Sequence, residues 1–262
     1  MSATTSISWT DHTWNPWVGC TQVSPGCAHC YMFAGQKRFG HDPTVVRRTK
    51  TWDAPLAWQR AAIAAGQPRR VFTCSWSDWF HADADAWRRE AWAVIRRCPQ
   101  LHFQILTKRA ERIASQLPPD WGAGYPNVWL GVSVENDRFV GRIDALRAVP
   151  CAVRFVSAEP LLGPLPSLEL TGIDWLIIGG ESGVRFRRME LAWVRALVER
   201  ARAADTRIWL KQRAAVRAEQ PLMVDGIRIR EFPGDRLALD DILPGRIRTI
   251  SDCSIPSDQF SE

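Results

Sequence analysis

Six short apolar runs, each reaching a polar or charged residue at its end, constrain the fold of this chain more than any other feature. They span residues 71–78, 103–108, 128–135, 153–159, 175–181 and 208–212. Their length and composition are typical of buried parallel strands. Helix-like stretches lie between them at 83–97, 109–116, 137–148 and 190–204, and an earlier one covers 52–65. The sequence therefore predicts an α/β protein built from strand–helix units.

The polar residues that end the runs favour a barrel over an open sheet. These residues are Asp78, Lys108, Glu135, Glu159, Glu181 and Lys211. In a (β/α) barrel the C-terminal ends of the strands meet around one mouth, where ligands bind. In an open doubly wound sheet they would be spread along an edge. We therefore expect a partial (β/α) barrel of six or seven parallel strands, with the residues above gathered at its mouth.

The 262 residues are enough to bury a sizeable core in one domain. Residues 1–213 are predicted to form the barrel, with the N-terminal segment supplying its first strand. Residues 214–262 are polar and contain several prolines, so we expect a C-terminal appendage or cap within the same domain. Within it, Asp225-Gly226 predicts the turn of a hairpin over 224–232.

Three cysteines, Cys20, Cys27 and Cys30, share one loop near the N-terminus, and the last two are spaced Cys-x-x-Cys. Thiolates in such a loop can hold a soft metal or an iron–sulfur cluster, and three ligands leave one position open for chemistry. A redox dithiol and a closed zinc site, completed by His12 or His29, are alternatives. Because no second ligand pair follows at zinc-finger spacing, the pattern favours an open site.

Charge and cysteine content indicate the cellular compartment of the protein and the kind of partner it binds. Seven cysteines are an odd number, and the sequence shows no signal peptide and no apolar run of about 18 residues, so we expect a cytoplasmic protein without membrane segments. A net charge of +6 suits a polyanionic partner. Most of the fourteen tryptophans are expected in the core. Trp17, Trp76 and Trp79 lie in or beside the predicted site loops, where an indole could stack on a base.

A series of motifs carries a family resemblance. They are Trp14-Asn-Pro-x-x-Gly-Cys20, Ser24-Pro-Gly-Cys27-x-x-Cys30-Tyr31, Ser75-x-Ser-Asp-x-Phe80, Leu106-Thr-Lys-Arg109, Leu130-Gly-Val-Ser-Val-Glu-Asn136, Glu159-Pro-Leu-Leu162 and Ile178-Gly-Gly-Glu-Ser-Gly183. In this order, over residues 7–212, they resemble the phage and prophage three-cysteine-motif family of unknown function. More broadly they resemble the radical S-adenosylmethionine superfamily, and the motif order is similar to spore photoproduct lyase-like enzymes. The chain departs from the superfamily in the six residues between Cys20 and Cys27, where three are usual.

The resemblance implies a set of cofactors and residue roles. Cys20, Cys27 and Cys30 would ligate a [4Fe-4S] cluster whose open iron binds S-adenosylmethionine. The cofactor would be held by Ser75, Ser77, Asp78, Lys108, Ser133 and Glu135. Of these, Asp78 suits the ammonium group, Lys108 the carboxylate, and Ser133 or Glu135 the ribose. Glu159, Glu181 and Lys211 are the expected catalytic residues at the mouth.

Reduction of such a cluster would yield a 5′-deoxyadenosyl radical that attacks the substrate. The expected substrate is a nucleobase, in a nucleotide or in nucleic acid. The expected partner is an electron-donor protein, and the need for a further partner protein stays open. Two functions of other classes also stay open: a zinc-containing nucleic-acid-binding protein, and a metal-dependent hydrolase that uses the carboxylates at the mouth. Each strand-end acid, taken alone, could also be a helix cap.

Overall fold

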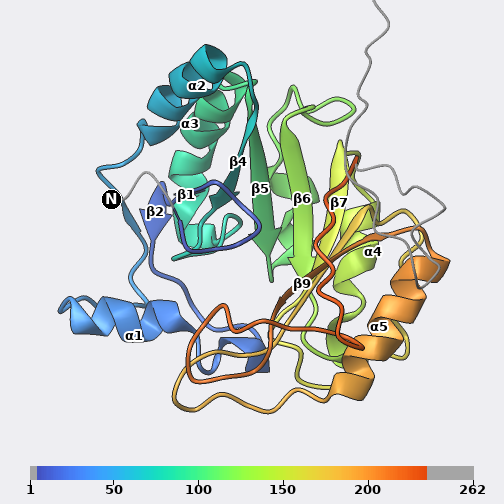
Figure 1. Cartoon of the computed structure of the whole chain (residues 1–262). Coiled ribbons are helices and arrows are strands. Elements are labelled where there is room, and N and C mark those ends of the chain that lie inside the picture. Colours follow the sequence, from blue (N-terminus) through green and yellow to red (C-terminus); the bar gives the residue numbers. More distant parts are fainter. Residues whose placement is uncertain (1–4, 235–262) are drawn as a thin grey trace, which may run out of the picture.

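Seven parallel strands form the central sheet of the computed structural model, which describes residues 5–234 (Figure 1). They are β1 (His12–Trp14), β4 (Arg69–Thr73), β5 (Leu101–Thr107), β6 (Val128–Ser133), β7 (Val153–Ala158), β8 (Trp175–Gly179) and β9 (Arg207–Gln212). Their order in space is their order along the chain, and every neighbouring pair is parallel. The sheet curls into a half-barrel. The predicted partial barrel of six or seven parallel strands is confirmed.

Two further strands lie beside the cysteine loop. β2 (Trp17–Val18) directly precedes this loop and pairs antiparallel with β3 (Arg47–Arg48). Each strand is only two residues long. The pair joins the segment before the cysteine loop to the segment after the helix that follows the loop. That helix is α1 (Tyr31–Arg38), which begins immediately after Cys30.

Helix α1 was not predicted, whereas the other four α-helices of residues 5–234 lie within predicted helical stretches, and two of the predicted stretches need correction. The other α-helices are α2 (Ala54–Ala65), α3 (Asp85–Arg96), α4 (Arg142–Arg147) and α5 (Leu191–Ala203). The stretch 109–116 was expected to be one helix and is instead two 3₁₀ turns, Ala110–Arg112 and Ala114–Gln116. Pro118 disfavours a helical conformation for the residue before it, and Leu117 is extended, so the helical turns end at Gln116.

Likewise, 137–148 is α-helical only over α4, after a 3₁₀ turn at Asp137–Phe139. Another 3₁₀ turn, Ala82–Ala84, leads into α3. Within residues 5–234, no helix is long and apolar enough to cross a membrane.

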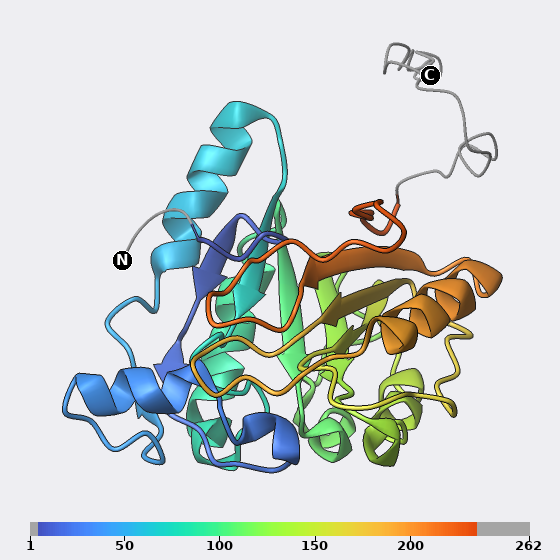
Figure 2. The ribbon, with the colours of Figure 1, turned by 60° about the horizontal axis from the view of Figure 1, so that its bottom comes forward.

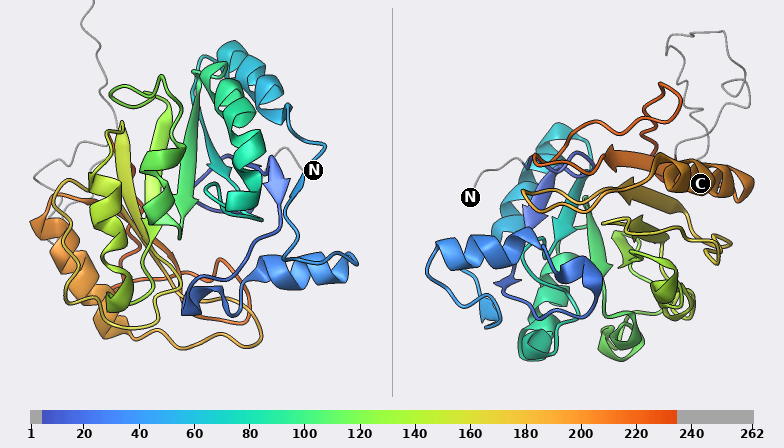
Figure 3. Two further views of the ribbon diagram at one scale, coloured as in Figure 1. Left: turned by 180° about the vertical axis from the view of Figure 1, so that it is seen from behind. Right: turned by 90° about the horizontal axis from the view of Figure 1, so that it is seen from below.

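Side chains along the strands alternate between two hydrophobic clusters, one on each face of the sheet. One cluster joins the strands to α3, α4 and α5, which cover the outer face (Figure 3). The other fills the inner face and is mostly aromatic, with Trp9, Phe72, Trp129, Phe155, Trp175 and Trp209 as members. Gly131 on β6 makes room for one of these rings, because a Cβ there would stand 2.4 Å from Phe155. Four tryptophans, Trp9, Trp129, Trp175 and Trp209, lie in this inner cluster, as expected for tryptophans of the core.

The segment after β9 completes the sheet edge (Figure 2). Hydrogen bonds from the Leu210 amide to the Ile229 carbonyl, and from the Glu231 amide to the Ile208 carbonyl, lay this segment antiparallel against β9. The turn at Asp225-Gly226 forms as predicted, with Val224 and Ile227 exchanging backbone hydrogen bonds. The prediction of a hairpin over 224–232 is wrong beyond this turn. The residues around Arg230 pair with the edge of β9 instead, whose backbone groups are available for hydrogen bonding.

Of residues 214–234, the short stretch around Arg230 pairs with β9 at the edge of the sheet. The remainder of the predicted cap, together with Cys253, lies outside the described residues.

Candidate functional site

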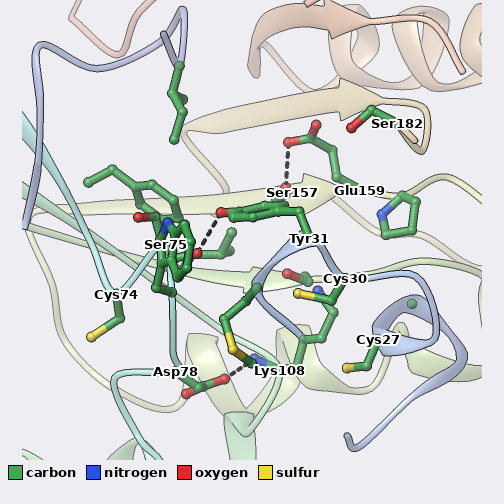
Figure 4. A pocket seen from close by; sticks show the side chains of 18 of the residues that line it. Cys27, Cys30, Tyr31, Cys74, Ser75, Asp78, Lys108, Ser157, Glu159 and Ser182 are labelled. Carbon is green, nitrogen blue, oxygen red and sulfur yellow. Dashed lines mark hydrogen bonds between the residues drawn. The ribbon is translucent and has the colours of Figure 1, made fainter. Parts of the chain in front are cut away.

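A cavity of about 510 Å³ opens where the parallel strands end (Figure 4). Most of the residues expected at the site line it: Cys20, Cys27, Cys30, Ser75, Ser77, Asp78, Lys108, Ser133, Glu159, Glu181 and Lys211. They come from the cysteine loop and from the ends of β4 through β9. Glu135 is the exception, since it is fully buried beneath the cysteine loop and does not line the cavity.

The cysteine loop, residues 19–30, is shaped by local backbone constraints. Gly19 has a φ of 98°, and a Cβ there would lie 2.3 Å from the Val45 carbonyl oxygen, so the position requires glycine. A 3₁₀ turn, Pro25–Cys27, then brings Cys27 close to Cys30, whose amide donates to the Cys27 carbonyl at 3.2 Å. Figure 4 shows both side chains directed into the cavity from this turn.

Residues after β4 and β5 hold the start of the loop. The Ser77 hydroxyl donates to the Gly19 carbonyl at 2.5 Å. Arg109 donates to the Thr21 carbonyl and hydroxyl, both at 2.9 Å, and approaches the Cys20 sulfur at 3.6 Å. Arg109 had no assigned role in the sequence analysis. Its position directly after Lys108 at a strand end was the signal that could have identified it.

Glu135, after β6, holds the middle of the loop. One carboxylate oxygen accepts a hydrogen bond from Ser24 at 2.5 Å, and the other accepts one from Arg142 at 2.7 Å. The Lys108 ammonium lies 3.6 Å from the same carboxylate. Gly26 packs directly on this group, since a Cβ at Gly26 would stand 2.4 Å from it. The structure thus places Glu135 as an anchor of the loop.

Glu181, after β8, holds the end of the loop. It accepts a hydrogen bond from His29 at 3.0 Å and a bidentate pair from Arg187, which also donates to the Pro25 carbonyl. Burial would raise the pKa of Glu181, but the hydrogen bonds from Arg187 and His29 outweigh it and lower the pKa to about 2. Glu181 is therefore ionised and fully engaged at neutral pH.

Glu159 and Lys211 form a different kind of pair on the cavity wall. Their charged groups lie 3.0 Å apart, and the Ser157 hydroxyl donates to Glu159 at 3.1 Å. Both side chains keep some exposure, 14% for Glu159 and 19% for Lys211. Ser157 was missed by the sequence analysis, although it stands two residues before Glu159 and so on the same face of β7. This trio retains donors and acceptors that can meet a ligand.

Asp78 has its acceptor positions filled from within the chain. One oxygen accepts from the Thr107 hydroxyl at 2.7 Å and the Phe80 amide at 2.9 Å. The other accepts from the Lys108 amide at 3.0 Å and lies 3.3 Å from Arg109. Because a carboxylate offers about four lone-pair directions, these contacts saturate it.

Two serines after β4 are also tied into the wall. The Ser75 side chain exchanges hydrogen bonds with Asn15, and its carbonyl accepts from the Tyr31 hydroxyl at 2.5 Å (Figure 4). The Ser77 hydroxyl is committed to Gly19, as described above. Tyr31, which follows Cys30 directly, was not singled out from the sequence, yet it crosses the cavity from the loop to β4.

The predicted base-stacking role does not suit two of the three tryptophans. Trp17 and Trp79 are completely buried in the outer core, where their rings lie 5.0 Å apart, and the Trp17 indole donates to the Asp78 carbonyl. Of these three tryptophans, Trp76 alone lines the cavity. A tryptophan next to a loop in the sequence can lie in the core beneath that loop or face the cavity, and the sequence does not distinguish the two positions.

Burial shifts the pKa of two of the site thiols, Cys20 and Cys30, upwards. Burial raises the pKa of Cys20 to about 11, with Asp78 adding to the rise while Arg109 opposes it. Burial also raises the pKa of Cys30. Loading a metal on these sulfurs would therefore release protons. Within residues 5–234, no three His, Cys, Asp or Glu side chains converge closely enough to hold a single metal ion.

These features define an α/β half-barrel protein with a three-cysteine loop at the mouth of its sheet. A family model described as "Protein of unknown function (DUF5131)" matches residues 4–237, and the chain belongs to this family. The search of curated proteins and the search of solved structures each found no match.

Proposed function

We propose that the chain is a radical S-adenosylmethionine enzyme with a [4Fe-4S] cluster on Cys20, Cys27 and Cys30. The observation that carries the proposal is the position of the cysteine loop. All three cysteines line one cavity at the C-terminal ends of the strands, where barrel enzymes bind their ligands. The loop brings three thiols and no fourth protein sulfur from its own residues, which suits a cluster with an open iron.

The three cysteines of the loop are a donor set that a cluster can use. A mononuclear ion needs its ligands around one point, whereas each cysteine of a cluster binds a different iron atom. The three thiols border the same cavity without converging on one point. When bound and reduced, the cluster would supply the electron that cleaves S-adenosylmethionine into methionine and a 5′-deoxyadenosyl radical.

The chain's own residues would orient the cofactor and exclude water. Lys108 lies on the cavity wall, where its ammonium can bind a carboxylate of the cofactor. Asp78 is saturated, so its role is to hold Lys108 and Arg109 in place through the contacts described above, without contacting the cofactor's ammonium group. Glu159 and Lys211, with Ser157, would position the substrate, because they face the same cavity and retain hydrogen-bonding capacity.

Arg109 would act on the cysteine loop. Its guanidinium lies between the Asp78 carboxylate and the Cys20 sulfur. A cation at this distance stabilises a thiolate over a thiol. The residue thus favours the form of Cys20 that can bind iron.

The decisive experiment is anaerobic reconstitution with iron and sulfide. We expect about four iron atoms per chain, a broad visible absorption that dithionite bleaches, and 5′-deoxyadenosine when S-adenosylmethionine and dithionite are added. Iron binding without 5′-deoxyadenosine would retain the cluster and reject the radical chemistry. A colourless protein with stoichiometric zinc would support the zinc or hydrolase alternatives instead.

A further inference from the structure

Two loops at the mouth of the sheet lie side by side and carry several arginines. Residues 182–190 follow β8, and residues 213–220 follow β9. Ser182 pairs with Ala215 in a parallel bridge, and the Gly183 amide donates to the carbonyls of Ala215 and Val216 at 3.1 and 3.2 Å. Figures 1 and 2 show the two loops running together at the end of the molecule that holds the cysteine loop. We call Arg185, Arg188, Arg213 and Arg217 on these loops the basic rim.

The charges of the basic rim are not neutralised by the protein. All four side chains are exposed, and none forms an ion pair with another residue of the described part of the chain. The two loops contain five arginines but only two glutamates. The fifth, Arg187, is the one bound to Glu181 and to the cysteine loop. It fixes the first loop in place and leaves its neighbours Arg185 and Arg188 directed to solvent.

The basic rim is continuous with the cavity. Ser182 from the first loop and Ala218 and Glu219 from the second line it, together with the rings of Tyr31 and Trp76. A cavity of about 510 Å³ lies within the size range of pockets for small ligands and is too small for a double helix. A chain of phosphates crossing the basic rim could therefore place one of its bases in this cavity, beside aromatic rings.

We propose that the basic rim binds the phosphate backbone of a single-stranded nucleic acid, one base of which enters the cavity. Guanidinium groups match phosphate oxygens in a bidentate fashion, and several uncompensated arginines on adjacent loops suit a partner that repeats its negative charge. The entry of a base as substrate rests on the function proposed above. Backbone binding at the basic rim does not, because it requires no cofactor.

The test is binding of fluorescent single-stranded DNA and RNA, each of about 12 nucleotides, to the cofactor-free full-length chain. Neutralising four phosphates of a single strand gives a salt slope of about 2.8 in log Kd against log salt, or roughly a 50-fold loss of affinity between 50 and 200 mM salt. The double variant Arg185→Ala/Arg213→Ala should lower this slope by about 1.4.

A matched control has the same charge change elsewhere. Arg60 on α2 and Arg89 on α3 are exposed and unpaired within residues 5–234, and these helices lie away from the two loops (Figure 1). The Arg60→Ala/Arg89→Ala variant should keep the wild-type slope. If both double variants lose the same amount, the binding reflects net charge alone and the basic rim is rejected.

Other outcomes also decide the matter. Absence of binding at 50 mM salt, or equal binding of a polyglutamate peptide or of anionic lipid vesicles, would overturn the assignment to nucleic acid. Oligonucleotide binding is measured on the cofactor-free chain and needs no cluster. Failure of the cluster proposal would appear in iron content and leave this result unchanged, so the two failures are distinguishable.

Discussion

The cysteine loop and the basic rim occupy the same end of the sheet but are built in opposite ways. The loop is held by side chains that follow four different strands: Ser77, Arg109, Glu135 and Glu181. The guanidinium groups of the basic rim form no ion pair within residues 5–234. A preorganised loop suits a cofactor that must be held in one geometry, and unpaired cations suit a ligand that arrives from solution. We therefore expect the cysteine loop to hold a resident cofactor and the basic rim to bind a ligand from solution.

The largest expected effect is on cofactor loading. Replacing Cys27 by alanine should reduce iron from about four atoms per chain to nearly none after anaerobic reconstitution, because a cluster depends on each of its few protein ligands. The Cys98→Ala variant should load normally, since Cys98 is buried in the outer core away from the loop. Full iron in Cys27→Ala, measured by a colorimetric iron assay, would contradict the role of the loop.

The anchors of the loop should also determine stability. Glu135→Ala leaves the buried Arg142 guanidinium without its carboxylate, and breaking a buried pair in this way typically costs about 3–5 kcal/mol. Urea denaturation of the metal-free protein measures this loss in the free energy of unfolding. Glu199→Ala, an exposed site on α5, provides the control and should change little. Equal stability of the two variants would show that Glu135 does not anchor the loop.

A smaller effect is expected from Glu181, and it depends on pH. Its pKa in the folded chain is about 2, below the ordinary 4.5, because Arg187 and His29 hydrogen-bond to the carboxylate. A lowered folded pKa contributes stability that is present above the ordinary value and lost as pH falls towards 2. Glu181→Gln should therefore flatten the fall in unfolding free energy across this range, as measured by urea titrations at several pH values. Glu199→Gln should keep the wild-type profile, and an unchanged profile in Glu181→Gln would be inconsistent with the anchor.

The smallest expected effect is on the stability of the basic rim. Arg185→Ala/Arg213→Ala removes no ion pair or side-chain hydrogen bond within residues 5–234, so the free energy of unfolding should stay within about 0.5 kcal/mol of wild type. Thermal and urea unfolding measure this directly. If this variant lost as much free energy of unfolding as Glu135→Ala, the basic rim would contribute to stability as the anchors of the cysteine loop do, and the contrast between the two regions would be wrong.

Much of the scaffold was predictable because the strands are buried on both faces. Such strands have continuous apolar sequences, and the first charged residue after each apolar run marks the end of the strand. For this reason the positions of Lys108, Glu159 and Lys211 at the mouth follow from the amino-acid pattern alone. The helix over 109–116 was predicted in error because its local pattern is helical, while the proline after it sets the conformation.

The roles of the strand-end acids could not be read from the sequence. Glu135 is bound by Ser24, which lies 111 residues earlier, and Glu181 by His29, 152 residues earlier. Strand-end position indicates that a carboxylate reaches the mouth, but only the folded loop shows whether a ligand or the protein itself occupies it. The same holds for Arg109, whose partner Cys20 lies 89 residues away.

The aromatic inner face of the sheet has a consequence for how the chain is made. The ring of Trp175 packs against Trp9 from the beginning of the chain and against Phe232 from near the end of the described part. A ribosome releases these three residues at widely separated times. Until Phe232 emerges, the ring of Trp175 lacks one of the aromatic side chains that pack against it in the folded chain. The inner face therefore closes only when the earliest and latest parts of the sheet meet, late in synthesis or after it.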